Sequence, residues 1–449
     1  MTATINEFFT VLNGYLWGWP MIVALLGTHI FLTVRLRFPQ RKILTAIRLS
    51  VSRDKGADGE VSQFGALATA LAATIGTGNI VGVALAVSTG GPGAVFWCWL
   101  CGIFGIATKY GEGLLAVKYR VQAPDGRMLG GPMYALERGL GMKWLAVLFA
   151  LFTALAAFGI GCTVQANAIS TLSFETYGAA RWLTGLAVTL LAAAVLLGGV
   201  KRIASVCAAL VPFMAVFYVL GCVALLWLNR SYVGEAVTLI FRSAFTPTAA
   251  GGGFVGASVM MAARYGIARG LFSNESGMGS APIIAAAART RNPVRQALVS
   301  STGTFWDTVV ICALTGVVLV SAILAYPDVS SSDGAALTKA AFAKLPMGQH
   351  VLAVAILTFA LSTILGWSYY GEQAMEYLAG SRSTRAYRWC YVVAVFLGSV
   401  VGLDLIWNVA DSLNALMALP NLVALLLLSG VLARETRRYL WENRLDDEA

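Results

Sequence analysis

The feature that most constrains the fold is a series of apolar stretches, each of bilayer length, that recur from one end of the chain to the other. A helix needs about 20 predominantly apolar residues to span the hydrocarbon core. Only 12% of the residues are charged, which is well below the share of about 25% in soluble proteins. The sequence therefore predicts an all-α polytopic membrane protein with about eleven spans, at residues 15–34, 64–89, 93–117, 145–170, 182–199, 206–228, 252–288, 297–324, 350–378, 388–405 and 409–433.

Basic residues are distributed unevenly over the loops between these spans. One set of loops and the C-terminal tail holds 24 Lys and Arg residues, including Arg35, Arg127, Arg295 and Arg434, whereas the opposite set holds five. Because basic loops stay on the cytoplasmic side, the N-terminus is expected outside and the C-terminus inside a bacterial inner membrane. This topology accounts for the formal charge of +10, so no nucleic-acid partner is required.

Two of the expected spans are interrupted by polar, glycine-rich sequence. The second span contains Thr74-Ile-Gly-Thr-Gly-Asn79, and the seventh contains Phe272-Ser-Asn-Glu-Ser-Gly-Met-Gly279 followed by Pro282. Unwound backbone at membrane depth is tolerated only where protein or a wet cavity satisfies it. A half-helix that begins at a break offers N–H groups to an anion, and one that ends there offers carbonyls to a cation. The two breaks therefore suit a zwitterion and an alkali ion.

The breaks lie five spans apart, so the two segments cross the membrane in opposite directions. Matching interrupted segments in two halves indicate the binding site of a transporter built from inverted repeats. We expect a single transporter domain with an extra span at about 15–34, a first five-span repeat at about 64–228 and a second at about 252–433. The simpler alternative is that the glycines only allow close helix packing, but two polar breaks in corresponding positions disfavour it.

At this point the sequence resembles a known family, the alanine or glycine:cation symporters. Residues 90–108 are similar to the family's signature, and residues 74–79, 131–134 and 270–282 match its other recurring stretches. Cys98 and Ile106 depart from it conservatively, since Met is expected at both positions. The resemblance implies a leucine-transporter-type fold of five plus five helices with one extra N-terminal span. It also implies sodium-coupled uptake of a small neutral amino acid such as alanine or glycine, although some relatives use protons, and it implies no organic cofactor.

The resemblance places the substrate at the first break. Thr77, Gly78 and Asn79 would offer N–H groups and a side-chain amide to its carboxylate. A buried amide, Gln165, needs partners that a ligand or a neighbouring helix supplies. Further substrate contacts are expected from the second break and the ninth span, at Phe272, Ser273 and Trp367, although large aromatic residues in membrane helices more often serve packing.

Sodium needs several oxygen ligands. The end of the first half-helix supplies candidates at Ala72, Thr74 and Ile75, and the ninth span, its partner in leucine-transporter-type folds, supplies the hydroxyls of Ser362 and Thr363. The alternative for these two hydroxyls is that they bond back to their own helix.

Charged residues inside the membrane are functional candidates by default. Glu275 and Asp307 are candidates for coupling, and Arg269 is expected to pair with Glu275 or to hold a gate. Lys109 and Glu112, three residues apart on one helix, are expected to form a local pair.

Two other function classes fit the sequence less well. Catalysis would require a nucleophile with a base, or metal ligands, but the sequence has two His residues, no HExxH motif and no Ser-His-Asp order. A channel would require a continuous polar pore, usually ringed by subunits. A carrier explains the paired breaks better than a membrane enzyme or a channel.

Overall fold

A computed structural model describes residues 2–52, 54, 58–247, 254, 256–331, 334–401 and 404–448 of the chain. Within these residues the chain is mostly helical, with one small antiparallel sheet made of β1 (Val121–Gln122) and β2 (Met128–Leu129). Six helices of the described part are long and apolar enough to cross a membrane, or up to eight if each of two bent helix pairs counts as one span.

The N-terminal span is a bent pair of helices, α1 (Thr2–Leu16) and α2 (Trp19–Arg35), that meet at 41°. The expected span at 15–34 covers only the second of them, so that boundary was wrong. The bend follows from Gly18, where an added Cβ would lie 2.9 Å from the Tyr15 carbonyl oxygen, and from Pro20 in the first turn of α2. A 3₁₀ turn (Pro39–Lys42) and α3 (Ile43–Ser50) follow.

The next part of the chain contains the first broken span. Its two halves, α4 (Gln63–Thr74) and the helix running from a π-helical segment (Gly78–Gly82) into α5 (Val83–Gly90), meet at 53°. The following elements are α6 (Gly93–Lys118), α7 (Pro132–Tyr134), a π-helical segment (Ala135–Gly139), α8 (Lys143–Phe158), a π-helical segment (Gly159–Thr163), α9 (Val164–Tyr177), α10 (Arg181–Leu196) and α11 (Gly199–Leu228).

The rest of the chain contains the second broken span, which is α13 (Val259–Asn274) followed by α14 (Pro282–Ala285). The remaining elements are α12 (Arg230–Ser243), α15 (Pro293–Thr304), a π-helical segment (Phe305–Cys312), α16 (Ala313–Ala325), α17 (Gly334–Phe342), α18 (Gly348–Ala379), α19 (Ser381–Val400), α20 (Asp404–Leu427), α21 (Ser429–Thr436) and a π-helical segment (Arg437–Trp441). The expected seventh span began at residue 252. The helix begins later, at Val259, and residues 252 and 253 lie outside the described part. Helices α12 and α17 lie in stretches that were expected to be loops.

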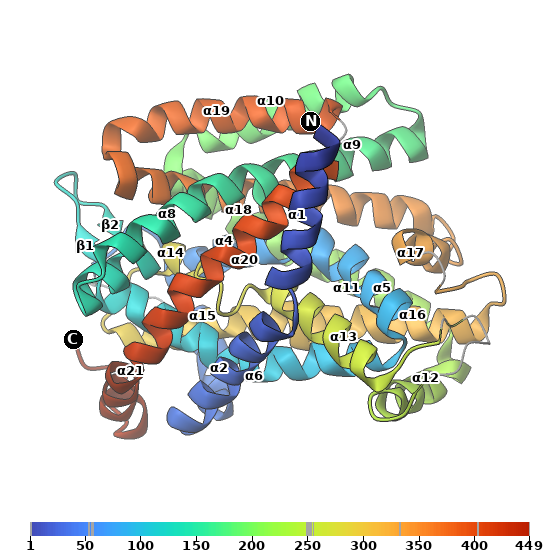
Figure 1. Cartoon of the computed structure of the whole chain (residues 1–449), viewed down its shortest axis with the longest axis horizontal. Helices are drawn as coiled ribbons and strands as arrows, with labels where there is room; N and C mark the ends of the chain where they lie inside the picture. Colours follow the sequence, from blue (N-terminus) through green and yellow to red (C-terminus); the bar gives the residue numbers. More distant parts are fainter. Residues whose placement is uncertain are drawn as a thin grey trace.

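The long helices pack in two groups. In one, α6 lies between α13 and α15, and in the other, α18 packs against α8, α9 and α19. The first broken span contacts both groups, because α4 packs against α18 and α11 whereas α5 packs against α13. Figure 1 shows α10 and α19 side by side along one edge of the molecule and α2 with α6 along the opposite edge.

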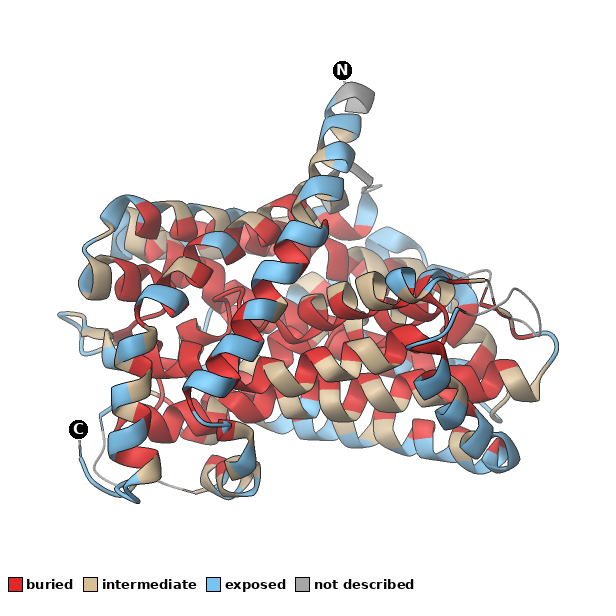
Figure 2. Cartoon of the chain, turned by 60° about the horizontal axis from the view of Figure 1, so that its bottom comes forward, coloured by how far each residue is buried: buried red, intermediate tan, exposed pale blue. Residues whose placement is uncertain are grey.

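Burial follows this arrangement. Figure 2 shows buried residues concentrated inside the bundle and exposed residues on its outward faces. Those outward faces are apolar on α10 and α11, where Leu190, Phe213 and Leu220 are more than half exposed. Large apolar surfaces of this kind are rare on soluble monomers, and they are the surfaces that lipid covers in a membrane protein.

Candidate functional site

The first break begins where α4 ends at Thr74. Ile75 leaves the helix with ψ 92°, and the Gly76 N–H donates to the Asn79 Oδ1 at 2.9 Å. A glycine is required at position 76 because an added Cβ would lie 2.7 Å from the Thr363 Oγ1. The interruption therefore depends on the close approach of α18 as well as on local backbone preference.

Asn79 connects the first break to Asp307. Its Nδ2 donates to the Asp307 Oδ1 at 2.7 Å and to the Asp307 carbonyl oxygen at 3.2 Å, and the residue is fully buried. Ser273, on the last turn of α13, donates its hydroxyl to the Asp307 Oδ2 at 3.0 Å. One carboxylate thus accepts hydrogen bonds from both broken spans. The side-chain amide of Asn79, expected to face the substrate, is engaged with Gly76 and Asp307 instead.

Thr77, Gly78 and Gln165 lie near one another on the other side of the first break. The Thr77 hydroxyl donates to the Gln165 Oε1 at 3.4 Å, and the Gln165 Nε2 donates to the Ile160 carbonyl at 3.1 Å. An added Cβ at Gly78 would lie 3.7 Å from the Ser273 Cα and 3.8 Å from the Phe272 ring. These expected substrate residues therefore come together from three separate spans.

The proposed sodium ligands also come together. The Ser362 hydroxyl donates to the Phe359 carbonyl at 2.8 Å and to the Ala72 carbonyl at 3.2 Å, which joins α18 to the end of α4. The Thr363 hydroxyl donates to the Phe359 carbonyl at 3.0 Å, and the Thr74 hydroxyl bonds back to its own helix.

These hydroxyls follow the back-bonded alternative, but their geometry is compatible with ion binding. A hydroxyl that gives its hydrogen to a helix carbonyl keeps oxygen lone pairs that can accept a cation. The Ser362 hydroxyl and the Ala72 carbonyl therefore bring together oxygen atoms from α18 and from the end of α4.

The second break runs from Glu275 to Ala281. It is held by Glu112 of α6, which was expected to pair with Lys109. Gly277 (φ 90°) and Gly279 (φ 85°) adopt left-handed conformations that favour glycine. Both donate their N–H groups to the Glu112 Oε1 at 3.0 Å, and the Asn421 Nδ2 donates to the same oxygen at 2.7 Å. The expected partner Lys109 is an electrostatic neighbour of Glu112, while the hydrogen bonds that the Glu112 carboxylate accepts come from the second break and from α20.

Glu275 and Trp367 form a second link between the breaks and α18. The Trp367 Nε1 donates to the Glu275 Oε1 at 3.0 Å, and the Ser280 hydroxyl donates to the other carboxylate oxygen. Trp367 is fully buried and packs against Gly161, where an added Cβ would lie 2.2 Å from the Trp367 Cβ. This hydrogen bond joins α18 to the second break, and the place of Trp367 at the substrate stays a prediction.

Arg269 does not pair with Glu275, so that alternative was wrong. It lines a separate cavity of about 210 Å³ together with Asp411, Trp17 and Phe272. Asp411 is an electrostatic neighbour of Arg269, so a positive and a negative group line the same cavity as Phe272.

The comparisons with known proteins agree with this arrangement. The sodium:alanine symporter family model matches residues 2–449, and the chain therefore belongs to the sodium:alanine symporter family. An uncharacterized transporter of Haemophilus influenzae is 51% identical over 442 residues, which cover 97% of this chain and 96% of that protein. The sodium/alanine symporter AgcS of Methanococcus maripaludis is 50% identical over 436 residues, which cover 95% of each chain.

A solved structure shares the fold. The crystal structure of MhsT in complex with L-phenylalanine matches with a TM-score of 0.60 at 15% identity, over 87% of this chain and 96% of MhsT. The expected family and the mostly helical, leucine-transporter-like architecture are thus confirmed. The family is one of sodium-coupled transporters, and the chain is a multi-pass membrane protein.

Proposed function

We propose that this chain is a secondary transporter that carries alanine or glycine, together with sodium, into the cytoplasm by alternating access. The observation that carries the proposal is the Asp307 carboxylate, which accepts hydrogen bonds from Asn79 of the first break and Ser273 of the second. Ordering of either break by a ligand is therefore transmitted to the other.

The substrate site we propose lies between the two breaks. The carboxylate binds the N–H groups of Thr77 and Gly78 at the start of a half-helix, where the dipole favours an anion. Gln165 holds Thr77 from one side, and Phe272 and Ser273 approach Gly78 from the other. The close approach of Phe272 leaves room for a methyl group or a hydrogen rather than for a long side chain.

The sodium ion binds at the end of the other half-helix. Its ligands are the carbonyls of Ala72 and Ile75 and the hydroxyls of Ser362 and Thr363, with Thr74 in the preceding turn. Because Ser362 already contacts the Ala72 carbonyl, sodium at this position ties α4 to α18 and orders the segment on which the substrate carboxylate lies. The two ligands then stabilise the same closed state.

Polar contacts that could act as gates lie at opposite ends of this site. Toward one end, Arg269 and Asp411 line the cavity that reaches Phe272. Toward the other, Arg127 of the β1–β2 hairpin donates two hydrogen bonds to the Glu376 carboxylate of α18, at 2.6 and 2.7 Å. The Glu376 carboxylate raises the pKa of Arg127.

Glu60 connects the same hairpin to the first broken span. Its Oε1 accepts a hydrogen bond from the Met128 N–H at 3.0 Å, and burial raises the pKa of the Glu60 carboxyl. The hairpin therefore bridges the entrance to α4 and the end of α18, the two helices that contribute the sodium ligands. We propose that this bridge closes the cytoplasmic side when the outer side is open.

The topology we propose keeps the eleven spans with the N-terminus outside and the C-terminus in the cytoplasm of the cell membrane. The bent pair α1–α2 is the extra span, and two five-span repeats at about 64–228 and 252–433 follow it. The support for this arrangement is the bias of 24 basic residues to five across the loops, and the interruption of both repeats in their first span.

Proteoliposomes containing the purified protein test the proposal. Labelled alanine is offered alone and in competition with a panel of amino acids, under an inward sodium gradient, an inward proton gradient or no gradient. Accumulation of alanine or glycine under the sodium gradient is the expected result. No uptake of either amino acid would overturn the substrate assignment, whereas uptake driven only by the proton gradient would favour proton coupling through the buried carboxylates of Asp307 and Glu275.

A further inference from the structure

A basic cavity lies away from the transport site, at the ends of two helices that are candidate membrane spans. It has a volume of about 300 Å³ and is lined by Arg35, Arg37, Arg434 and Arg437, with Trp441 beside them. Arg35 is the last residue of α2, and Arg434 belongs to α21, which follows the end of α20. We infer that this cavity binds the phosphate of an anionic phospholipid headgroup.

The charge of the cavity is largely uncompensated. Among the residues that the structure describes, Arg437 is the only one of the four arginines with an ion-pair partner, Glu442 at 3.4 Å. Guanidinium groups present donors in a planar fork that matches phosphate oxygens. Several arginines that converge on one cavity therefore form a site for an anion. The general enrichment of basic residues in cytoplasmic loops does not require such convergence.

One side of the cavity is formed by a turn in which two residues other than glycine have positive φ angles. Arg37 (φ 61°) and Phe38 (φ 60°) both adopt the left-handed conformation, which is uncommon for such residues. Hydrogen bonds from Arg37 N–H to the Val34 carbonyl at 3.1 Å and from Phe38 N–H to the Thr33 carbonyl at 2.8 Å hold the turn. Strained backbone of this kind persists where the surrounding structure holds it, and it often marks a functional position. In this protein the two left-handed residues turn the chain directly after Arg35 and Leu36.

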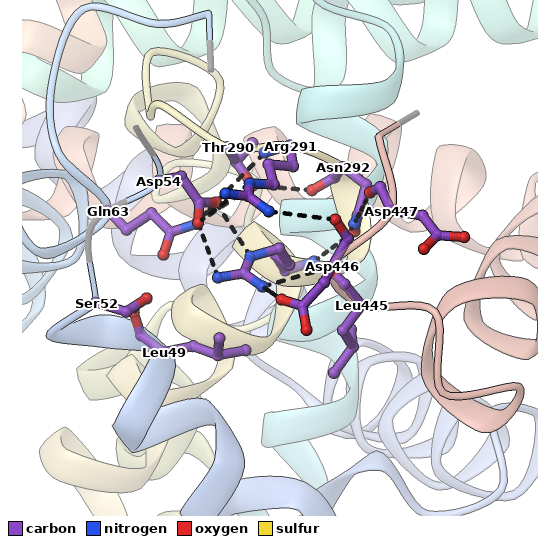
Figure 3. A network of polar contacts seen from close by, with 11 residues as sticks. Leu49, Ser52, Asp54, Gln63, Thr290, Arg291, Asn292, Leu445, Asp446 and Asp447 are labelled. Atoms are coloured by element: carbon purple, nitrogen blue, oxygen red, sulfur yellow. Dashed lines mark hydrogen bonds and ion pairs between the residues drawn. The ribbon is translucent and has the colours of Figure 1, made fainter. Parts of the chain in front are cut away.

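The opposite wall of the cavity is fixed by the C-terminal segment. The Trp441 Nε1 donates to the Leu36 carbonyl at 3.2 Å, which joins the two walls. Beyond Trp441 the tail is anchored on α15, because Arg295 forms ion pairs with Asp54 at 2.8 Å and Asp446 at 2.6 Å (Figure 3). Asn292 adds hydrogen bonds to two tail carbonyls, each at 2.9 Å, so the wall that carries Arg434 and Arg437 is held in place before any ligand binds.

The ligand we assign is a lipid rather than free phosphate because apolar surface adjoins the cavity. On α2, Ile30, Phe31 and Val34 are 43%, 42% and 61% exposed, and on α20, Leu427 is 57% exposed. The three α2 side chains lie within two turns of Arg35, and Leu427 ends the helix that precedes α21, which carries Arg434; acyl chains run here when a headgroup occupies the cavity. Basic pockets between membrane helices on the cytoplasmic side bind anionic headgroups in this way.

Lipid retention tests the inference. The full-length protein is purified in a mild detergent, mixed with phosphatidylglycerol or phosphatidylcholine of the same acyl composition, and analysed by native mass spectrometry. The wild-type protein is expected to retain phosphatidylglycerol preferentially. The double variant Arg35→Gln/Arg434→Gln is expected to bind it roughly 10- to 30-fold more weakly, since each basic residue near the headgroups contributes about tenfold or less.

Matched variants separate a site from a general charge effect. Arg382→Gln/Arg385→Gln removes the same charge from exposed positions at the start of α19 and is expected to retain the wild-type preference. Arg35→Lys/Arg434→Lys keeps the charge and is expected to recover most of the binding, which also controls for misfolding of the glutamine variant.

Three outcomes would overturn the inference. The first is equal retention of the two lipids by the wild-type protein, and the second is an equal loss in both glutamine variants. The third is binding of inorganic phosphate or glycerol phosphate with the affinity of the lipid, because the acyl chains would then contribute nothing and the site would be one for a soluble anion.

Discussion

Asn79 and Asp307, which are 228 residues apart, are joined by a hydrogen bond of 2.7 Å between the amide Nδ2 and the carboxylate Oδ1. The second oxygen of Asp307 accepts from Ser273, so removal of the carboxylate leaves buried donors on both breaks. Asp307→Ala is therefore expected to weaken alanine binding roughly 10- to 100-fold, at about 1–3 kcal/mol for an unsatisfied buried group.

Isothermal titration of alanine into the detergent-solubilised variant measures this change. Asp307→Asn retains one acceptor oxygen and is expected to lie between the wild-type protein and Asp307→Ala. Wild-type affinity in the alanine variant would show that the two breaks do not depend on this carboxylate.

Ser362 contacts the end of the first half-helix, and its loss is expected to lower sodium affinity. Ser362→Ala removes one oxygen ligand and the link to Ala72, and we expect about a tenfold higher sodium concentration for half-maximal alanine uptake, equivalent to about 1.4 kcal/mol. Thr358→Ala is the matched control, since Thr358 bonds back to the same helix one turn away but is only partly buried. Equal sodium dependence in both variants would remove Ser362 from the ion site.

Glu112 is expected to stabilise the folded protein through the second break. Glu112→Ala leaves the N–H groups of Gly277 and Gly279 and the amide of Asn421 without their acceptor, at a cost of about 2 kcal/mol or more. A lower midpoint of thermal unfolding in detergent is the expected readout. Glu435→Ala, which removes a partly exposed partner of Lys118, is expected to change the midpoint little.

Gly161 allows α18 to approach the π-helical segment that follows α8. Gly161→Ala places a methyl group where only 2.2 Å separates it from the Trp367 Cβ, so the Trp367 contact with Glu275 cannot form without movement of a helix. We expect loss of alanine transport together with reduced stability, since overpacking costs about 1–3 kcal/mol. Gly234→Ala, on α12, meets no atom within 4 Å and is expected to behave as wild type.

The hairpin that carries Arg127 is expected to become mobile when its ion pair is removed. Arg127→Gln loses the bidentate bond to Glu376, a buried carboxylate, and hydrogen exchange of residues 121–129 should accelerate at least about tenfold. Arg385→Gln, at an exposed position with the same charge change, should leave that exchange unchanged. Unaltered protection in Arg127→Gln would mean that the hairpin is held by its other contacts, such as Glu60 with the Met128 N–H.

The features that could be predicted from the sequence are those with a local signal. Both breaks follow from glycine and asparagine within apolar stretches, because these residues favour unwound backbone wherever they lie. The proximity of Ser362 to Ala72 could be expected only from the family resemblance, and the structure places the two residues in contact.

The features that could not be predicted depend on contacts between distant parts of the chain. Glu112 accepts hydrogen bonds from the N–H groups of Gly277 and Gly279, which lie 165 and 167 residues further along the chain. The sequence spacing pointed instead to Lys109, on the same helix. The indole N–H of Trp367 donates to Glu275, 92 residues away, a contact for which the sequence holds no local signal. The bend between α1 and α2 is permitted by Gly18, where an added Cβ would lie 2.9 Å from the Tyr15 carbonyl oxygen, and apolar periodicity carries no signal for it.

The central claim is that one pair of linked breaks binds the amino acid and the ion together. Its most direct test is the dissociation constant of alanine, measured by titration of the purified protein at several sodium concentrations with choline as the replacement cation. If sodium orders the first break, alanine affinity rises with sodium, and alanine raises sodium affinity by the same factor, because coupling between two binding sites is reciprocal. An alanine dissociation constant that does not change between choline and sodium would contradict the account.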